Sequence, residues 1–204
     1  MNPPKITRFG KIAIVGIGLI GGSLARDVRR LGIANQIIGY DNNLIYQQEI
    51  RSLDLVDYLG TIPDEKLLEA DLILLAVPVK AFEIIVRQIL PYLSPSVIIT
   101  DTGSVKSPLL KLMSAPEFKK INFVGGHPIA GSEHYGPSAA QEKLFMGKRL
   151  FLTMSENTDN IAVDKVSGLW KSLGAKVTKI DADIHDKMFA SVSHLPHILA
   201  YACI

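Results

Sequence analysis

The stretch KIAIVGIGLIGGSLARDVRRLG, residues 11–32, decides the fold of this chain. Its first residues form a short, apolar, β-branched run that predicts a buried strand, and the glycine-rich turn GIGLIG follows that run directly. Residues 19–31 then carry apolar side chains at helical spacing, and Gly32 is well placed to end the predicted helix. A strand, a glycine turn and a helix in this order are typical of the first unit of a dinucleotide-binding sheet.

The three glycines of this turn can each be given a physical task. Gly16 permits the tight turn, Gly18 lets the backbone approach a pyrophosphate, and Gly21 lets the helix pack close to the strand. The backbone N–H groups of Leu19 and Ile20 then belong to the positive end of the helix, which faces the phosphates. A turn with a purely structural use is the alternative, since a motif of this type is weak evidence by itself.

Asp41 adds an acidic group where a nucleotide site needs one. It ends the predicted second strand, 20 residues after Gly21. A carboxylate there accepts hydrogen bonds from both hydroxyls of an adenosine ribose and repels a 2′-phosphate, which favours NAD over NADP. Asn42 and Asn43 follow and supply no cation that would favour NADP. An ordinary surface aspartate is the alternative, but the strand, the helix and the acid stand in register.

The rest of the chain continues the alternation of strands and helices. Further strands are predicted at residues 36–41, 70–78, 96–103, 121–128, 149–154 and 176–182, and further helices at 43–53, 79–93, 104–113 and 163–174. This alternation predicts an α/β fold with a doubly wound, Rossmann-like, mostly parallel sheet over residues 1–182. Residues 183–204 have only helical spacing, so we interpret them as the beginning of a C-terminal helical domain. That pattern reaches Ile204 without a cap or a charged tail, and we therefore expect the chain to be truncated.

Composition narrows the classes of partner and compartment. The 204 residues carry a net charge of +2, which is too close to neutral to favour binding to nucleic acid or to an anionic membrane. Cys203 is the only cysteine, so no internal disulfide can form, and a cytoplasmic setting is the simplest interpretation. The N-terminus has no apolar run of signal-peptide length, and the longest apolar run, residues 72–79, is too short to span a bilayer.

Candidate catalytic residues follow three of the predicted strands. In open α/β sheets, ligands bind at the carboxyl ends of the strands. Val77 and Pro78 end the third strand and are expected to form a wall beside a nicotinamide or a ribose. Ser104 follows the fourth strand, where it meets substrate, caps the next helix, or does both. His127 ends the fifth strand between glycines that let a ligand approach, although a lone histidine beside a turn is usually structural.

Four motifs carry a family resemblance: VGIGLIGGSLA at 15–25, DTGSVK at 101–106, GGHPIAGSE at 125–133 and SHLPH at 193–197. By the order and spacing of these motifs, which cover nearly the whole chain, the sequence resembles the prephenate/arogenate dehydrogenases of tyrosine biosynthesis. The resemblance implies a small-molecule substrate, prephenate or arogenate, which is oxidatively decarboxylated with a nicotinamide cofactor. It also implies a homodimer that forms through a helical domain.

Carried onto this sequence, the resemblance implies a role for each of four residues. His127 is the catalytic histidine, and Ser104 contacts substrate and nicotinamide. His197 contributes to the substrate pocket, and Glu133 is a pocket or gating residue. The arginine that binds the substrate carboxylate in this family would lie beyond Ile204. Relatives with both the histidine and the glutamate are more similar to the prephenate enzymes, so prephenate is preferred to arogenate as the substrate.

The expected chemistry needs a base and no metal ion. Neutral His127 would accept the proton of the C4 hydroxyl of the substrate ring while hydride leaves C4 for the nicotinamide, and CO2 then leaves C1. His194 and His197 stand three residues apart on a predicted helix, which could suggest a metal site. The spacing to His185 and Asp186 does not bring these groups together on one helix, so no metal is expected.

Three other functions stay open at this point. An arogenate dehydrogenase would differ only in the side chain of its substrate. A non-catalytic NAD-binding module or fragment is possible because the chain stops before the arginine implied by the resemblance. A β-hydroxyacid dehydrogenase would share the nucleotide-binding half, but those enzymes rely on a helix lysine for which we find no signature here.

Overall fold

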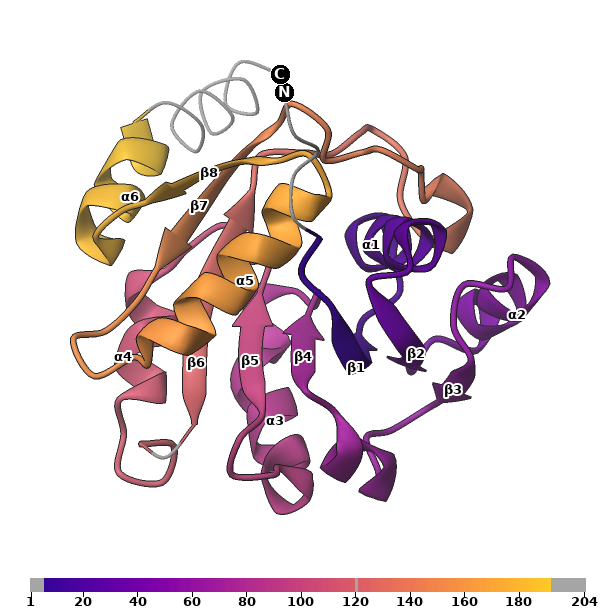
Figure 1. Cartoon of the computed structure of the whole chain (residues 1–204), viewed down its shortest axis with the longest axis horizontal. Coiled ribbons are helices and arrows are strands. Elements are labelled where there is room, and N and C mark those ends of the chain that lie inside the picture. The colour runs from indigo at the N-terminus through magenta and orange to yellow at the C-terminus, as the bar shows by residue number, and fades with distance from the viewer. Residues whose placement is uncertain (1–5, 120, 192–204) are drawn as a thin grey trace, which may run out of the picture.

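The computed structural model describes residues 6–119 and 121–191, and these contain one eight-stranded sheet covered by helices on both faces (Figure 1). The strands are β1 (Phe9–Val15), β2 (Ala34–Tyr40), β3 (Tyr58–Gly60), β4 (Leu72–Leu75), β5 (Ile98–Asp101), β6 (Asn122–Pro128), β7 (Arg149–Thr153) and β8 (Lys176–Lys179). The helices are α1 (Leu19–Leu31), α2 (Leu44–Ser52), α3 (Val79–Ile89), α4 (Ser107–Met113), α5 (Asn160–Ser172) and α6 (Ala182–Phe189). Short 3₁₀ helices are η1 (Glu65–Glu69), η2 (Leu90–Tyr92) and η3 (Pro137–Ala139).

The strand order is β3-β2-β1-β4-β5-β6-β7-β8. β1 pairs in parallel with both β2 and β4, so the chain winds outward from β1 in two opposite directions. β7 runs antiparallel to β6 and parallel to β8. The predicted doubly wound, mostly parallel α/β fold is therefore confirmed. A crevice for a ligand is expected where the winding reverses, at the carboxyl ends of β1 and β4.

β1 shows how the sheet buries both of its faces. Successive side chains of a strand point to opposite faces, and in β1 they join two separate hydrophobic clusters. Ile12 and Ile14 pack in the cluster to which α1 and α5 contribute. Ala13 and Val15 pack in the cluster to which α3 and α4 contribute. Burial on both faces explains why this strand is an unbroken apolar run in the sequence.

Three details differ from the sequence prediction or lie outside its reach. The sequence pattern does not predict β3, because three residues between turns carry no periodicity. α4 begins at Ser107, and its N-cap position is Lys106, so the suggestion that Ser104 caps this helix is wrong. Of the last predicted helical segment, residues 183–204, the structure shows α6. Residues 192–204 lie outside the described residues.

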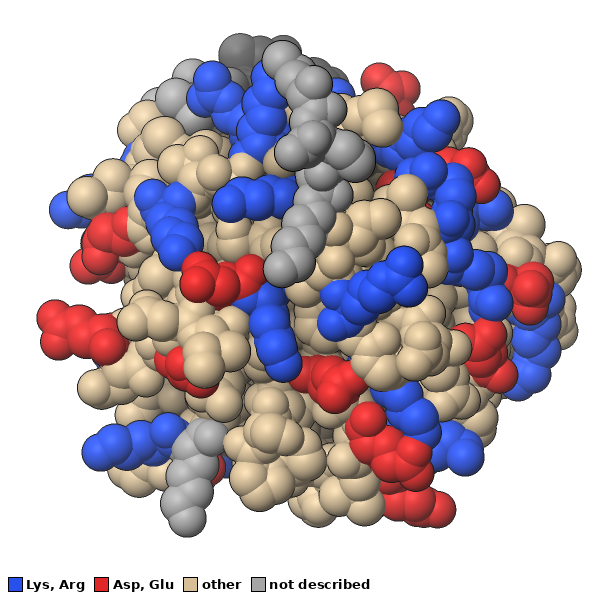
Figure 2. Space-filling view, viewed as in Figure 1, with Lys and Arg blue, Asp and Glu red and all other residues tan. Residues whose placement is uncertain are grey.

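Charged side chains of both signs stand beside one another on the molecular surface. Figure 2 shows lysine and arginine next to aspartate and glutamate over one face. Arg29 pairs with Asp57 at 2.8 Å, and Arg30 pairs with the buried Asp27 at 2.6 Å. Such pairs partly neutralise the cationic groups around α1. In the described ranges, no helix combines the length and the apolar character needed to cross a membrane.

Candidate active site

A cleft of about 560 Å³ lies at the carboxyl ends of β1, β2 and β4, where the winding of the sheet reverses. Five of the residues predicted to bind cofactor line this cleft: Gly16, Gly18, Asp41, Val77 and Pro78. The side chains of Leu19 and Ile20 pack against the hydrophobic core instead. Only the backbone N–H groups of these two residues, in the first turn of α1, can therefore serve a phosphate.

The surroundings of Gly18 and Gly21 fit a pyrophosphate at the start of α1. A Cβ atom on Gly18 would meet nothing within 4 Å, so this side of the turn is open. A Cβ atom on Gly21 would overlap the carbonyl oxygen of Gly16, because the helix packs directly on the turn. Gly18 is the N-cap residue of α1, makes no side-chain cap, and is followed by a first turn without an acidic residue. An anionic ligand group can occupy such a helix N-terminus.

We expect alanine at these two glycines to separate ligand binding from folding. Gly18→Ala adds a methyl group to the open side of the turn, so NAD affinity should fall about tenfold or more while stability hardly changes. Gly21→Ala forces the helix away from the turn and should lower the free energy of unfolding by about 1–3 kcal/mol. Calorimetric NAD titration and urea unfolding measure the two effects. Wild-type NAD affinity in Gly18→Ala would show that the pyrophosphate does not pass over Gly18.

Asp41 is held at the rim of the same cleft by two backbone donors. The N–H of Ile17 donates to its Oδ2 at 2.9 Å, and the N–H of Asn43 donates to its Oδ1 at 2.9 Å. The side chain of Gln47 also donates to the carbonyl oxygen of Asp41 at 2.7 Å. Each carboxylate oxygen has further acceptor capacity, so the group can still bind two ribose hydroxyls. The donors orient it toward the glycine turn, as an adenosine site requires.

A second cavity, of about 350 Å³, brings Ser104 and His127 together at the carboxyl ends of β5 and β6. The sequence predicts both of these residues for the site. Lys148 and Phe189 also line the cavity, and sequence reasoning missed them. Lys148 precedes β7, whose antiparallel direction brings its amino end to this edge of the sheet. No sequence signal distinguishes that lysine from other surface lysines.

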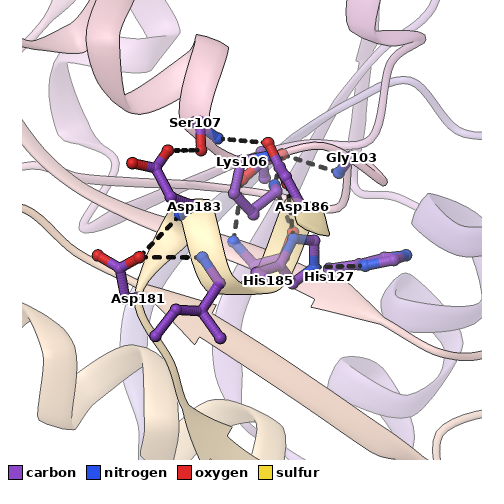
Figure 3. A network of polar contacts seen from close by, with 11 residues as sticks. Gly103, Lys106, Ser107, His127, Asp181, Asp183, His185 and Asp186 are labelled. Carbon is purple, nitrogen blue, oxygen red and sulfur yellow. Dashed lines mark hydrogen bonds and ion pairs between the residues drawn. The ribbon is translucent and has the colours of Figure 1, made fainter. Parts of the chain in front are cut away.

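His127 is the first member of a chain of three side chains (Figure 3). Its Nδ1 lies 2.9 Å from Nε2 of His185, and Nδ1 of His185 lies 2.7 Å from Oδ1 of Asp186. The ring of His185 is fully buried and packs against Phe189, with 4.6 Å between ring centroids. Phe189 also contacts the His127 ring edge-on at 4.7 Å. α6 therefore holds the imidazole of His127 from one side.

The ionisation states along this chain follow from burial and hydrogen bonding. Burial lowers the pKa of His185 below its ordinary value, although the Asp186 carboxylate acts to raise it. Burial acts to raise the pKa of Asp186, but hydrogen bonds from His185 and from the N–H groups of Ser107 and Lys106 outweigh it, and the pKa is lowered. At neutral pH, His185 is therefore neutral and Asp186 is ionised.

A buried ion pair supports the strand end that carries His127. Lys106 and Asp101 form it, and their side chains are 0% and 1% exposed. The Nζ of Lys106 also donates to the carbonyl oxygen of Gly126 at 2.8 Å, and Asp101 accepts from the N–H groups of Gly126 at 2.9 Å and Gly103 at 2.8 Å. Burial lowers the pKa of the Lys106 ammonium, although the adjacent carboxylate acts in the opposite direction. The pair thus fixes the backbone next to His127.

The N-terminus of α4 is capped from another helix. Asp186 on α6 accepts from the N–H groups of Lys106 at 2.8 Å and Ser107 at 2.9 Å. Asp183 accepts from the hydroxyl of Ser107 at 2.6 Å. These bonds explain why Ser104 does not need to cap α4 and stays exposed beside the cavity. Asp186 serves both this helix and His185.

Some of the predicted site residues do not line the cavity that contains Ser104 and His127, or lie outside the described residues. Glu133 is exposed on the loop after β6 and is not among the residues that line the cavity. His197 and His194 lie outside the described residues, as does Cys203. Across the described ranges, no group of three or more His, Cys, Asp and Glu side chains is arranged to hold a metal ion.

Comparison with known proteins gives consistent matches. Residues 24–179 match the family described as "Prephenate dehydrogenase, nucleotide-binding domain". The cyclohexadienyl dehydrogenase of Zymomonas mobilis is 36% identical over 199 residues, which are 98% of this chain and 68% of that protein. The prephenate dehydrogenase of Lactococcus lactis is 35% identical over 93% of this chain and 52% of its own length. This chain thus spans about half to two thirds of the length of these curated relatives.

Two solved structures extend the comparison to the fold. The prephenate dehydrogenase of Aquifex aeolicus, in complex with hydroxyphenyl propionate and NAD+, has a TM-score of 0.90 and 35% identity, over 98% of this chain and 69% of that one. The arogenate dehydrogenase of Synechocystis has a TM-score of 0.82 and 34% identity, over 95% of this chain and 69% of that one.

Proposed function

Because the chain belongs to the prephenate dehydrogenase family, we propose that it is the nucleotide-binding part of an NAD-dependent enzyme that oxidatively decarboxylates prephenate to 4-hydroxyphenylpyruvate. One observation carries this proposal. Ser104 and His127 share a cavity at the same edge of the sheet as the nucleotide cleft, and His127 is held there by its contacts with α6. A histidine at such a position can act on a substrate that lies beside the nicotinamide.

The residues of the nucleotide cleft fit NAD. The open side of Gly18 and the N-terminus of α1 suit a pyrophosphate, and Asp41 suits an unphosphorylated ribose. Val77 and Pro78 form the cleft wall on the side of β4. When bound, NAD supplies the acceptor for the hydride that leaves C4 of the substrate ring.

His127 acts as the general base in this proposal. It accepts the proton of the C4 hydroxyl as that oxygen becomes a carbonyl. When CO2 leaves C1, the electron pair of the broken C–C bond passes through the ring to the C4 oxygen, and His127 returns the proton to that oxygen as the phenol forms. A positioned base contributes about 10²–10⁴-fold to the rate. The hydroxyl of Ser104 lies exposed in the same cavity, where it can orient the substrate hydroxyl. Further substrate contacts from His197 and Glu133 are proposed on the family resemblance.

The choice between prephenate and arogenate is tested by steady-state kinetics of the full-length protein. We expect a measurable kcat for NADH formation. We also expect kcat/KM to be at least about tenfold higher for prephenate than for arogenate, which is a difference of about 1.4 kcal/mol in transition-state binding. The reverse ratio would identify an arogenate enzyme. NAD binding without turnover of either substrate would identify a non-catalytic nucleotide-binding module.

The domain boundary and the setting of the protein are also proposals. The family match ends at residue 179 and α6 begins at Ala182, which supports a boundary near 182 and a helical domain that starts at 183. A homodimer of the full-length protein is proposed on the family resemblance. A cytoplasmic location is proposed because Cys203 is the only cysteine in the sequence.

A further inference from the structure

His127, His185 and Asp186 form a chain of hydrogen bonds with a defined donor-to-acceptor direction. Asp186, at one end of the chain, can only accept a hydrogen bond, and this fixes the direction of the other bonds. Asp186 has a lowered pKa, and an ionised carboxylate can only accept hydrogen bonds. Nδ1 of His185, at 2.7 Å from Oδ1 of that carboxylate, must therefore carry the proton and donate it. In a neutral imidazole the other nitrogen then accepts, so Nε2 of His185 accepts from Nδ1 of His127 at 2.9 Å.

The chain therefore determines which nitrogen of His127 is basic. With Nδ1 of His127 acting as the donor to His185, the lone pair of the neutral ring resides on Nε2. The opposite tautomer would leave Nδ1 of His127 and Nε2 of His185 facing each other as two acceptors. Burial of His185 makes that mismatch costly, because water cannot supply the missing proton.

The groups around His185 come from several elements and agree with this direction. Asp186 follows it on α6, and the buried Lys106–Asp101 pair faces it from the end of β5 and the N-cap position of α4. Asp186 is itself anchored by the N–H groups of Lys106 and Ser107 (Figure 3). The carboxylate therefore cannot rotate away without breaking two further hydrogen bonds.

We infer that His185 and Asp186 are positioning residues for the proposed reaction, which orient the ring of His127 and hold it as the tautomer whose Nε2 accepts the substrate proton. This inference rests on the proposed function for its reaction, but the direction of the chain is a property of the protein alone. The two residues touch neither substrate nor cofactor in this role. They act through His127, and after proton transfer the Asp186 carboxylate stabilises the charge that His127 acquires.

Two variants of the full-length protein test the kinetic consequence. Asp186→Asn replaces the anionic acceptor of the Nδ1 proton of His185 by a neutral amide, which weakens the hold on this tautomer and removes the charge that stabilises protonated His127, and it should lower kcat about 10²-fold. His185→Phe keeps an aromatic ring against Phe151 and Phe189 but removes the acceptor for His127, and kcat should fall similarly. Because neither variant changes the nucleotide cleft, the Kd for NAD and the KM for prephenate should change less than about threefold.

Asp183→Ala is the matched control. It lies on the same helix and removes the hydrogen bond from Ser107 that joins α6 to α4, but it has no part in the chain. Its kcat should stay within about twofold of the wild-type value. A loss in this control as large as in the other two variants would mean that docking of α6, and not the direction of the chain, controls the rate, and would overturn the inference.

Nitrogen NMR of the wild-type protein tests the direction of the chain independently of turnover. With ¹⁵N-labelled histidine above pH 8, His127, assigned by its loss in His127→Asn, should show a protonated Nδ1 and an unprotonated Nε2. A protonated Nε2 with a bare Nδ1 overturns the inference, as does a kcat within about threefold of wild type in both variants. If both variants fail to fold, the wild-type spectrum decides alone. If the wild type binds NAD but oxidises neither substrate, the proposed function fails, and the spectrum still decides the direction of the chain.

Discussion

His127→Asn should lower kcat about 10²–10⁴-fold, a loss of roughly 3–5 kcal/mol of transition-state stabilisation. The asparagine amide can still donate to Nε2 of His185 from nearly the position of Nδ1, so the substitution removes the proton acceptor and keeps this hydrogen bond to α6. The nucleotide cleft lies at other strand ends, so the Kd for NAD should change less than about twofold. Stopped-flow NADH formation and calorimetric NAD titration of the full-length protein measure the two quantities.

The pH dependence and a second histidine serve as controls for this result. A histidine base must be neutral to accept a proton, so wild-type kcat should fall on acidification. His127→Asn should lack that limb. His134 is exposed on the loop after β6, and His134→Asn should keep kcat within about twofold. Wild-type kcat in His127→Asn would remove this residue from the proposed mechanism.

Lys106→Met should lower the free energy of unfolding by about 3–5 kcal/mol, because it leaves the Asp101 carboxylate buried without its cation. The same change removes the donor to the carbonyl oxygen of Gly126, so the strand end that carries His127 should also lose its support. We therefore expect kcat to fall as well in any fraction that folds. Guanidinium unfolding followed by circular dichroism measures the stability of the variant.

Two further variants separate burial from charge in this experiment. Lys11 forms an ion pair with Glu69 whose side chains are 30% and 67% exposed, so Lys11→Met should cost only about 0–1 kcal/mol. Adding Asp101→Asn to Lys106→Met removes the unpaired charge and should recover part of the lost stability. Equal costs at Lys11 and Lys106 would contradict the burial of the Lys106–Asp101 pair in solution.

The nucleotide half of the molecule could be predicted in detail because its determinants are local. The turn at Gly16–Gly21 lies in one unbroken segment, and each glycine acts through its own backbone. Asp41 is recognised by its position at the end of the next strand, so only the strand period was needed to find it. Leu19 and Ile20 were also predicted to bind the cofactor, and only their backbone N–H groups can do so, because their side chains pack against the core.

The candidate catalytic site could be predicted only in part. Ser104 and His127 follow parallel strands, and the carboxyl ends of such strands meet at one edge of the sheet, so sequence pattern brings them together. His185 and Asp186 could only be weighed as metal ligands, since nothing in their spacing indicates what they contact. Their true partners lie 58 residues away at His127 and 80 residues away at Lys106.

The sequence by itself determined the doubly wound sheet, the glycine turn and the edge of the sheet at which the cleft and the second cavity lie, because periodicity and backbone requirements act between near neighbours in the chain. Only the tertiary structure decided that Lys106 is a buried ion-pair partner and that α6 aligns a carboxylate and an imidazole behind His127. Burial and hydrogen-bond direction depend on how α4, α6 and β6 pack against one another, and no local sequence pattern predicts that packing.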